Sequence, residues 1–127
     1  MKYIWLCAVL LCTPCHPVKA EEWNSERIQV ALERVSTRWG VPPLLVRAIM
    51  DVESSAHPWT VNVEGKDLYP RKSEDALRLV RTALARGESV DVGLMQINSY
   101  WIHKLRLSPD IVLDPFVNLT VGAWILA

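Results

Sequence analysis

All three cysteines of this 127-residue chain, Cys7, Cys12 and Cys15, fall within its first fifteen residues. The rest of the chain therefore has no thiol for a disulfide and must fold by burying apolar surface. Half of the residues are hydrophobic and 22% are charged, which is typical of a globular protein and too apolar for a disordered segment. The length leaves room for a single domain.

The first 20 residues have the pattern of a secretory signal peptide. Lys2 precedes an apolar run from Tyr3 to Leu11 that is too short to span a bilayer, and Ala20 is the small residue expected before a cleavage site. We therefore expect residues 1–20 to be a signal peptide and residues 21–127 to be the exported domain.

Two alternatives for this segment fit less well. Pro14 and Pro17 would break a buried N-terminal helix or strand. A lipoprotein signal would use Cys12, but the residue before it is Leu11, where such signals favour a small side chain.

The charges of the whole chain balance, with 14 Lys and Arg against 14 Asp and Glu. This balance disfavours nucleic acid and other polyanions as partners. Loss of Lys2 and Lys19 with the signal peptide leaves the domain slightly acidic. An exported domain without cysteines fits the bacterial periplasm, and we find no further apolar run long enough to cross a membrane.

The apolar residues of the domain recur mostly at three- and four-residue spacing, which predicts a mainly α-helical fold. The predicted helices begin at capping or proline residues and run from Asn24 or Ser25 to Gly40, from Pro42-Pro43 to about Ser55, from Ser73 to Gly87, from Asn98 or Ser99 to about Leu105, and from Asp114-Pro115 to the end of the chain. Between them, residues 59–69 are typical of an irregular loop or a short hairpin.

Glu53 occupies an unusual place on the second predicted helix. It follows Ile49 by four residues and Leu45 by eight, so it should share the line of side chains, with Ala48 and Val52 beside it, that we expect to face the core. Burial and the negative end of the helix dipole would both raise the pKa of its carboxyl group, as a general acid requires.

Other readings of this region remain open. Glu53 could instead bond Ser54 or face the solvent, and Asp51 is a second carboxylate, although it lies off the apolar line. His57 could act as a base, but it precedes Pro58 in a predicted loop. The few scattered histidines do not suggest a metal site.

A second group of candidate residues lies between Asp91 and Asn98. Gly93 permits close approach of the backbone, Met95 offers an adaptable apolar contact for a sugar face, and Gln96 and Asn98 offer hydrogen bonds to hydroxyl or acetamido groups. A turn with a buried apolar core would show the same pattern, so the segment alone is weak evidence for a ligand site.

Three segments together resemble the soluble lytic transglycosylase family, whose domain is lysozyme-like and mainly α. They are Ala48-Ile-Met-Asp-Val-Glu-Ser-Ser55, Asp91-Val-Gly-Leu-Met-Gln-Ile-Asn98 and Asn118-Leu-Thr-Val-Gly122. The resemblance extends from Val41 to Ala127. The amino-acid sequence of the second segment and the C-terminal Val-Gly-Ala-Trp-Ile-Leu-Ala resemble those of the specialised branch of the family that serves conjugation, pilus and secretion machines.

The resemblance implies an enzyme that cuts peptidoglycan between N-acetylmuramic acid (MurNAc) and N-acetylglucosamine (GlcNAc) and needs no cofactor. Glu53 would protonate the glycosidic oxygen and then accept the proton of the MurNAc 6-hydroxyl as a 1,6-anhydro ring closes. Ser54 would position the glutamate or the acetamido group. Met95, Gln96 and Asn98 would line the glycan groove.

Two departures from the family pattern bear on activity. The segment from Tyr69 to Val90 is a longer insert than in compact members, and could reshape the groove or bind a partner. The family's Tyr-Asn motif on a later helix has no counterpart before the chain ends at Ala127, so we expect the domain to be incomplete at its C-terminus. A hydrolytic lysozyme-type muramidase and a non-catalytic peptidoglycan-binding assembly module are the alternatives.

Overall fold

Helices and a small sheet alternate along the chain in a computed structural model that describes residues 22–127. The predicted signal peptide, residues 1–20, lies outside the described residues. The helices are α1 (Ser25–Trp39), α2 (Pro43–Ser54), α3 (Ser73–Ala85), α4 (Ser99–Lys104), α5 (Pro109–Leu113) and α6 (Pro115–Leu126). The strands are β1 (Val61–Val63), β2 (Lys66–Leu68), β3 (Val90–Val92) and β4 (Ile97–Asn98). The prediction of a mainly α-helical single domain is confirmed.

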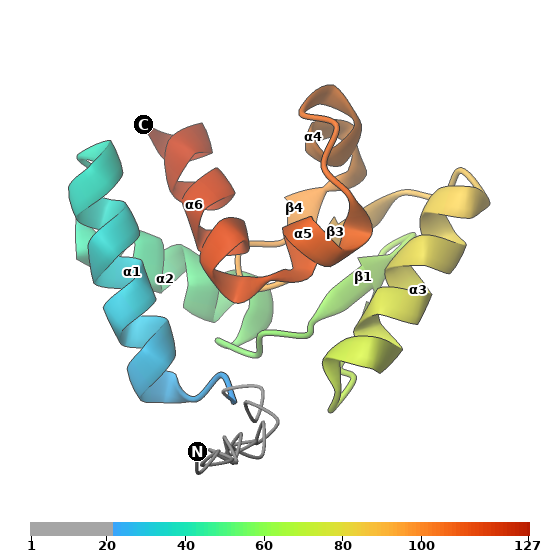
Figure 1. The fold of residues 1–127 in the computed structure, drawn as a ribbon, viewed down its shortest axis with the longest axis horizontal. Helices are drawn as coiled ribbons and strands as arrows, with labels where there is room; N and C mark the ends of the chain where they lie inside the picture. The colour runs from blue at the N-terminus through green and yellow to red at the C-terminus, as the bar shows by residue number, and fades with distance from the viewer. Residues whose placement is uncertain (1–21) are drawn as a thin grey trace, which may run out of the picture.

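The first helix forms as its sequence predicts. The Asn24 side chain accepts a hydrogen bond from the backbone N–H of Arg27 over 2.9 Å, and Gly40 ends the helix in the left-handed conformation. Its core-facing residues are Ile28, Ala31, Leu32 and Val35. Helix α1 packs against α2 and lies side by side with α6 (Figure 1).

The sheet is antiparallel, with the strand order β2-β1-β3-β4. The hairpin β1–β2 realises one of the two alternatives for residues 59–69, and its turn places Glu64 and Gly65 at positive φ. Strands β3 and β4 form a second hairpin, in which Asp91 pairs with Asn98 and Val92 with Ile97.

Helix α3 lies within the predicted insert, residues 69–90, and is an integral part of the core. Its residues Ala76, Val80 and Ala83 are buried, and it packs against β1, β3 and α5 (Figure 1). The insert therefore supports the sheet from one side.

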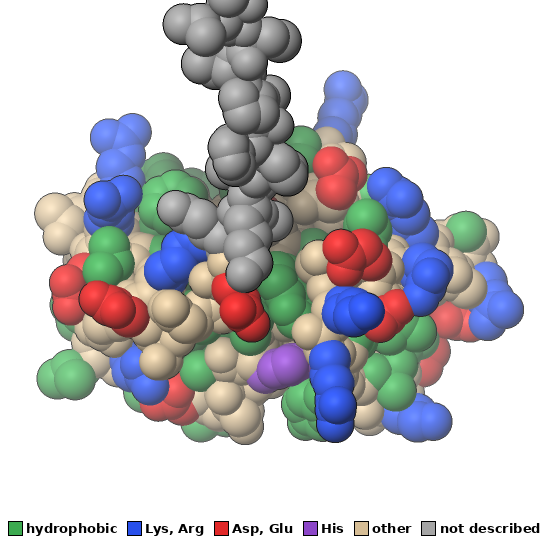
Figure 2. Space-filling model, turned by 60° about the horizontal axis from the view of Figure 1, so that its bottom comes forward, with side chains coloured by type: hydrophobic (Ala, Val, Ile, Leu, Met, Phe, Trp, Pro, Cys, Tyr) green, Lys and Arg blue, Asp and Glu red, His purple; other side chains and the backbone are tan. Residues whose placement is uncertain are grey.

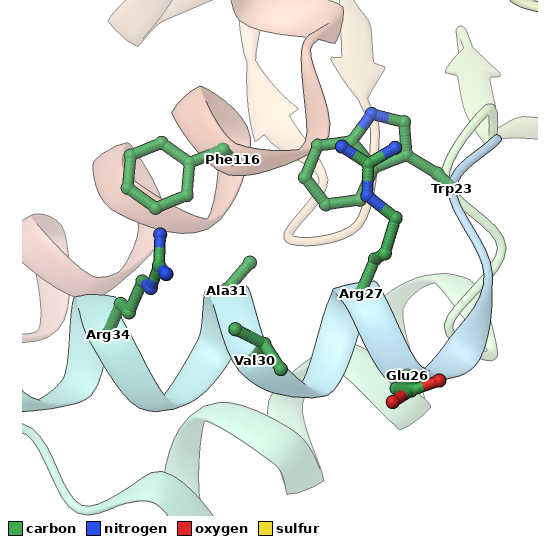
Figure 3. Close-up of a pocket in the computed structure, with 7 residues that line it drawn as sticks. All are labelled: Trp23, Glu26, Arg27, Val30, Ala31, Arg34 and Phe116. Atoms are coloured by element: carbon green, nitrogen blue, oxygen red, sulfur yellow. The ribbon is translucent and has the colours of Figure 1, made fainter. Parts of the chain in front are cut away.

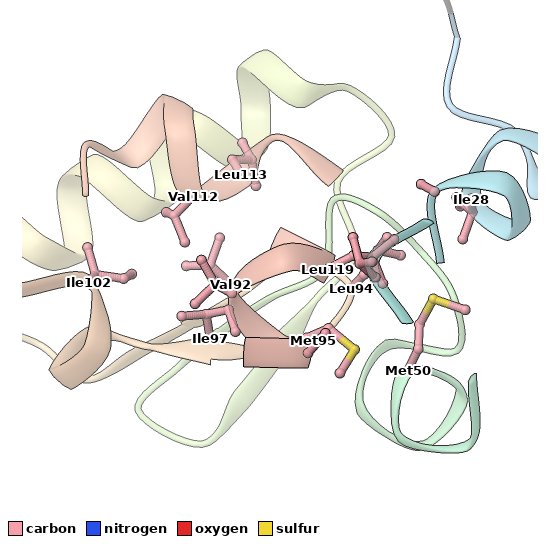
Figure 4. Packing of buried hydrophobic residues seen from close by; sticks show 14 of the residues in the cluster. Ile28, Met50, Val92, Leu94, Met95, Ile97, Ile102, Val112, Leu113 and Leu119 are labelled. Carbon is pink, nitrogen blue, oxygen red and sulfur yellow. The ribbon is translucent and has the colours of Figure 1, made fainter. Parts of the chain in front are cut away.

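The core is one cluster that joins the helices to the sheet. Figure 4 shows Met50 of α2, Leu94 and Met95 of the β3–β4 turn and Leu119 of α6 within it. In the part of the chain that the structure describes, no helix is long and apolar enough to cross a membrane. On the face shown in Figure 2, basic and acidic side chains are interspersed, as expected from the balanced composition.

Candidate active site

A groove of about 190 Å³ opens where α2, the β3–β4 hairpin, α4 and α6 meet. We call it the Met95 groove, and its lining residues are Ile49, Met95, Gln96, Ile97, Asn98, Trp101, Gly122, Ile125 and Leu126. The groove thus brings together Met95, Gln96 and Asn98, the three predicted glycan-binding residues.

The turn between β3 and β4 depends on Gly93. This glycine has a φ of 78°, and a Cβ atom there would lie 2.5 Å from Nδ2 of Asn118. Gln96, at the other end of the turn, also adopts a left-handed conformation, with a φ of 47°. Because such a backbone is strained for residues other than glycine, the surrounding contacts must hold it in place.

Asn118 provides several of those contacts from a fully buried position in α6. Its Oδ1 accepts a hydrogen bond from the backbone N–H of Met95 over 2.8 Å. Its Nδ2 donates to the carbonyl oxygens of Val92, at 2.7 Å, and Val112, at 2.9 Å. One amide side chain therefore fixes the turn that carries Met95 and Gln96.

The floor of the groove also depends on a close contact between α6 and the turn. A Cβ atom at Gly122 would lie 2.6 Å from Cγ of Met95. Only the absence of a side chain at residue 122 lets Met95 lie against α6, where it is 7% exposed.

Ser54 joins α2 to the same turn. Its hydroxyl group is buried and lies 2.8 Å from the carbonyl oxygen of Leu94 and 3.0 Å from that of Met50. Ser54 does not line the groove. Its two predicted roles, positioning of Glu53 or of the acetamido group, stay predictions.

Glu53 is exposed, and the expectation that it faces the core is wrong. The buried line of α2 consists of Val46, Met50 and Ser54, while Leu45 and Val52 are 45% and 84% exposed. One residue of a helix corresponds to a rotation of about 100°, so a shift by one position turns the predicted line out of the core. The shielding expected for the Glu53 carboxyl group is therefore absent from the described part of the chain.

Glu53 nevertheless lies next to the groove. Ile49 lines the groove, and residues four apart on a helix are neighbours, with Cβ atoms roughly 5–6 Å apart. Helix α2 ends at Ser54, one residue after Glu53, because Ser55 and Ala56 have φ values of 51° and 57°. The carboxylate is thus carried on the last turn, one turn beyond the groove wall.

The other polar groups around α2 have protein partners. The Asp51 carboxylate accepts from Nε of Arg47 at 3.1 Å. Nε2 of His57 lies 2.8 Å from the carbonyl oxygen of Pro70. Neither residue lines the Met95 groove.

The amide groups of the groove are held by the sheet. Nε2 of Gln96 donates to the carbonyl oxygens of Thr60, at 3.1 Å, and Gly93, at 2.9 Å. Nδ2 of Asn98 donates to Oδ1 of Asp91 over 2.7 Å. These bonds fix the orientation of both side chains. None of them uses Oε1 of Gln96, and no other described group binds this oxygen. It can therefore accept a hydrogen bond from a ligand.

Comparison with known proteins gives the family. The model of the transglycosylase SLT domain matches residues 31–127. The chain belongs to the transglycosylase SLT family. Its mainly α fold with a small antiparallel sheet agrees with the lysozyme-like domain that the sequence motifs implied.

Several curated relatives of this SLT domain are named virB1. The chain is 40% identical over 88 residues to "Protein virB1" of Agrobacterium fabrum, covering 68% of this chain and 36% of that protein. It is 31% identical over 88 residues to "Type IV secretion system protein virB1" of Brucella abortus, covering 68% and 37%. It is 38% identical over 78 residues to "Protein virB1" of Rhizobium radiobacter, covering 60% and 33%. The chain thus spans about a third of the length of these relatives. No solved structure matches it.

Two residues that position the groove in this SLT domain are not predicted as site residues by the sequence. Asn118 belongs to one of the three family segments without a predicted role, and Thr60 falls in the predicted loop or hairpin. Both are fully buried polar residues, and the Thr60 carbonyl accepts from the backbone N–H of Gly93 at 2.8 Å as well as from Gln96. An asparagine within the apolar sequence of α6 is the signal that could have identified the first of them. Within residues 22–127 no group of His, Cys, Asp and Glu side chains is arranged to hold a metal ion.

Proposed function

We propose that this SLT domain is a lytic transglycosylase that cuts peptidoglycan strands between MurNAc and GlcNAc. The observation that carries the proposal is the position of Glu53 on the last turn of α2, one turn beyond Ile49 in the wall of the Met95 groove. A carboxyl group at the edge of a groove lined with apolar and amide side chains suits cleavage of an amphipathic glycan.

In the proposed reaction Glu53 serves first as an acid and then as a base. It donates its proton to the glycosidic oxygen as the bond from that oxygen to C1 of MurNAc breaks. The 6-hydroxyl oxygen then bonds to C1, and its proton passes to the Glu53 carboxylate. The product carries a 1,6-anhydro ring, no water is consumed, and the acid is regenerated.

The MurNAc acetamido oxygen supports C1 between the two steps and takes the place of the second carboxylate that retaining glycosidases use. This fits the surroundings of Glu53, where Asp51 is paired with Arg47. Glu53 is exposed, so the protein does not cover its carboxyl group. The bound glycan strand must therefore exclude water from the reacting atoms.

Met95, Gln96 and Asn98 are proposed to hold the sugar rings. The Met95 side chain presents an apolar surface, and the two amides present hydrogen-bonding groups whose orientation the sheet fixes. Ser54 is a positioning residue, since its hydrogen bond to Leu94 fixes the end of α2 relative to the turn.

We place this activity in the bacterial periplasm, with residues 1–20 as the export signal. The relatives named virB1 include a type IV secretion system protein of Brucella abortus. On this basis we propose that the domain opens the wall locally for a secretion apparatus, with the glycan strand as its substrate and components of that apparatus as partners.

Cleavage of purified peptidoglycan in water labelled with oxygen-18 tests the reaction. Mass spectrometry should find 1,6-anhydro-MurNAc ends that contain no labelled oxygen. Reducing MurNAc ends with one labelled oxygen would show a hydrolytic muramidase instead. Binding of peptidoglycan without any new ends would favour a non-catalytic assembly module.

A further inference from the structure

A second cleft, of about 420 Å³, lies between residues 26–34 of α1 and the first turn of α6 (Figure 3). We call it the α1–α6 cleft, and its lining residues are Trp23, Arg27, Val30, Ala31, Arg34 and Phe116, with Glu26 at the rim. It shares no lining residue with the Met95 groove. Its volume falls within the range of roughly 300–1,000 Å³ that is usual for small-ligand sites.

The cleft has apolar walls that no other side chain covers fully. Val30 on α1 is 45% exposed, and Phe116 on α6 is 42% exposed. Ala31, which is buried, lies between them at the base. A ligand with an apolar body would remove both exposed side chains from water, which favours binding.

The charge of the cleft is positive. Arg27 and Arg34 are seven residues apart and share one face of α1, and Figure 3 shows the Arg34 guanidinium directed toward Phe116. The Arg27 guanidinium lies over the Trp23 ring, 4.8 Å from its centroid, and forms one end wall. Glu26 lines the same cleft, so two guanidinium groups stand against one carboxylate and the net charge of the lining is positive. Within residues 22–127, Arg34 has no ion-pair partner.

The chemistry of this cleft differs from that of the groove. Its lining contains no Asn, Gln, Ser or Thr side chain, so its side-chain polar groups are mainly the charged ones of Arg27, Arg34 and Glu26. A guanidinium group matches a carboxylate through two parallel hydrogen bonds. We propose that the α1–α6 cleft binds an acidic peptide segment, with an aromatic side chain between Val30 and Phe116 and a carboxylate on Arg34.

The smallest probe with this chemistry is N-acetyl-phenylalanine, and its neutral carboxamide is the matched control. Titration of the full chain, followed by backbone amide NMR, should shift the signals of Ala31, Arg34 and Phe116. The carboxylate should bind at least five-fold more tightly than the carboxamide. Arg34→Gln should abolish this difference, whereas Arg38→Gln, which removes a charge on α1 outside the cleft, should preserve it.

Three results would overturn the proposal. Equal affinity for the carboxylate and the carboxamide would remove the role of Arg34. Shifts at Gln96 and Trp101 in place of the cleft residues would locate the ligand in the Met95 groove. Inorganic phosphate that shifts the same signals as strongly as N-acetyl-phenylalanine would indicate a simple anion site without the apolar contact.

Discussion

The hydroxyl group of Ser54 lies 2.8 Å from the carbonyl oxygen of Leu94, a residue 40 positions further along the chain. This bond joins the residue after Glu53 to the turn that carries Met95 and Gln96. The acid and the glycan-binding residues proposed here are therefore connected through one buried contact. The same contact makes the geometry of the site sensitive to residues that would never touch the substrate.

Replacement of Ser54 by alanine should weaken both stability and activity. The Leu94 carbonyl group would lose its side-chain partner in a buried environment, which costs about 1–3 kcal/mol in the free energy of unfolding. Urea denaturation measures this change. Ser108→Ala is the matched control, because the Ser108 side chain forms no capping hydrogen bond, and it should leave stability within about 0.5 kcal/mol of the parent. Equal effects of the two substitutions would argue against the connecting role of Ser54.

Asn118→Asp should be more disruptive than Ser54→Ala. The substitution keeps the acceptor for the Met95 N–H but replaces the donor to Val92 and Val112 with a carboxylate oxygen that faces two carbonyl groups. An unpaired buried charge of this kind should cost at least about 3 kcal/mol at neutral pH. Thermal and urea unfolding test this expectation, and a loss below about 1 kcal/mol would contradict the assigned hydrogen bonds.

The contact between Gly122 and Met95 can be tested with a pair of substitutions. Gly122→Ala places a methyl group 2.6 Å from Cγ of Met95, closer than two carbon atoms can approach, so Met95 should be displaced and peptidoglycan binding should fall. Met95→Ala removes two of the three obstructing atoms, Cγ and Cε, and leaves Cβ at 2.7 Å, so it should relieve the clash in part. Gly122→Ala should therefore lower the free energy of unfolding more in the parent protein than in the Met95→Ala variant. Urea unfolding of the parent, the two single variants and the double variant measures both differences. Additive effects would exclude the close contact.

The orientation of α2 gives a direct prediction of stability. Val46 is fully buried, so Val46→Ala should cost about 2 kcal/mol through lost burial and the cavity that remains. Val52 is 84% exposed, and Val52→Ala should change stability by less than about 0.5 kcal/mol. A larger loss in the free energy of unfolding for Val52→Ala than for Val46→Ala would support the orientation of α2 that hydrophobicity alone predicts.

Local signals in the sequence are sufficient to predict where several helices begin or end. Asn24 and Gly40 bound α1, Pro43 begins α2, and Asn98 caps α4 through a hydrogen bond to the N–H of Tyr100. Each of these features acts within a few residues. They are read from neighbouring positions without knowledge of the tertiary fold.

The orientation of α2 and the supports of the groove depend on partners far away in the sequence, so a local sequence pattern does not predict them. Ser54 completes the buried line of α2 because Leu94 accepts its hydrogen bond, yet a serine does not look like a core residue in a hydrophobic pattern. Strands β3 and β4, of three and two residues, are too short for a recognisable alternation. The role of Asn118 requires contacts 23 and 26 residues away.

The most direct test of the central claim compares two carboxylates on the same helix. Glu53→Gln removes the proposed acid, and Asp51→Asn removes an exposed carboxylate that is paired with Arg47. Release of 1,6-anhydro-MurNAc products from purified peptidoglycan should fall at least about 100-fold for Glu53→Gln, since general acid–base catalysis supplies about 10²–10⁴-fold. Asp51→Asn should retain most of the parent rate. Cleavage by Glu53→Gln at the parent rate would contradict the account.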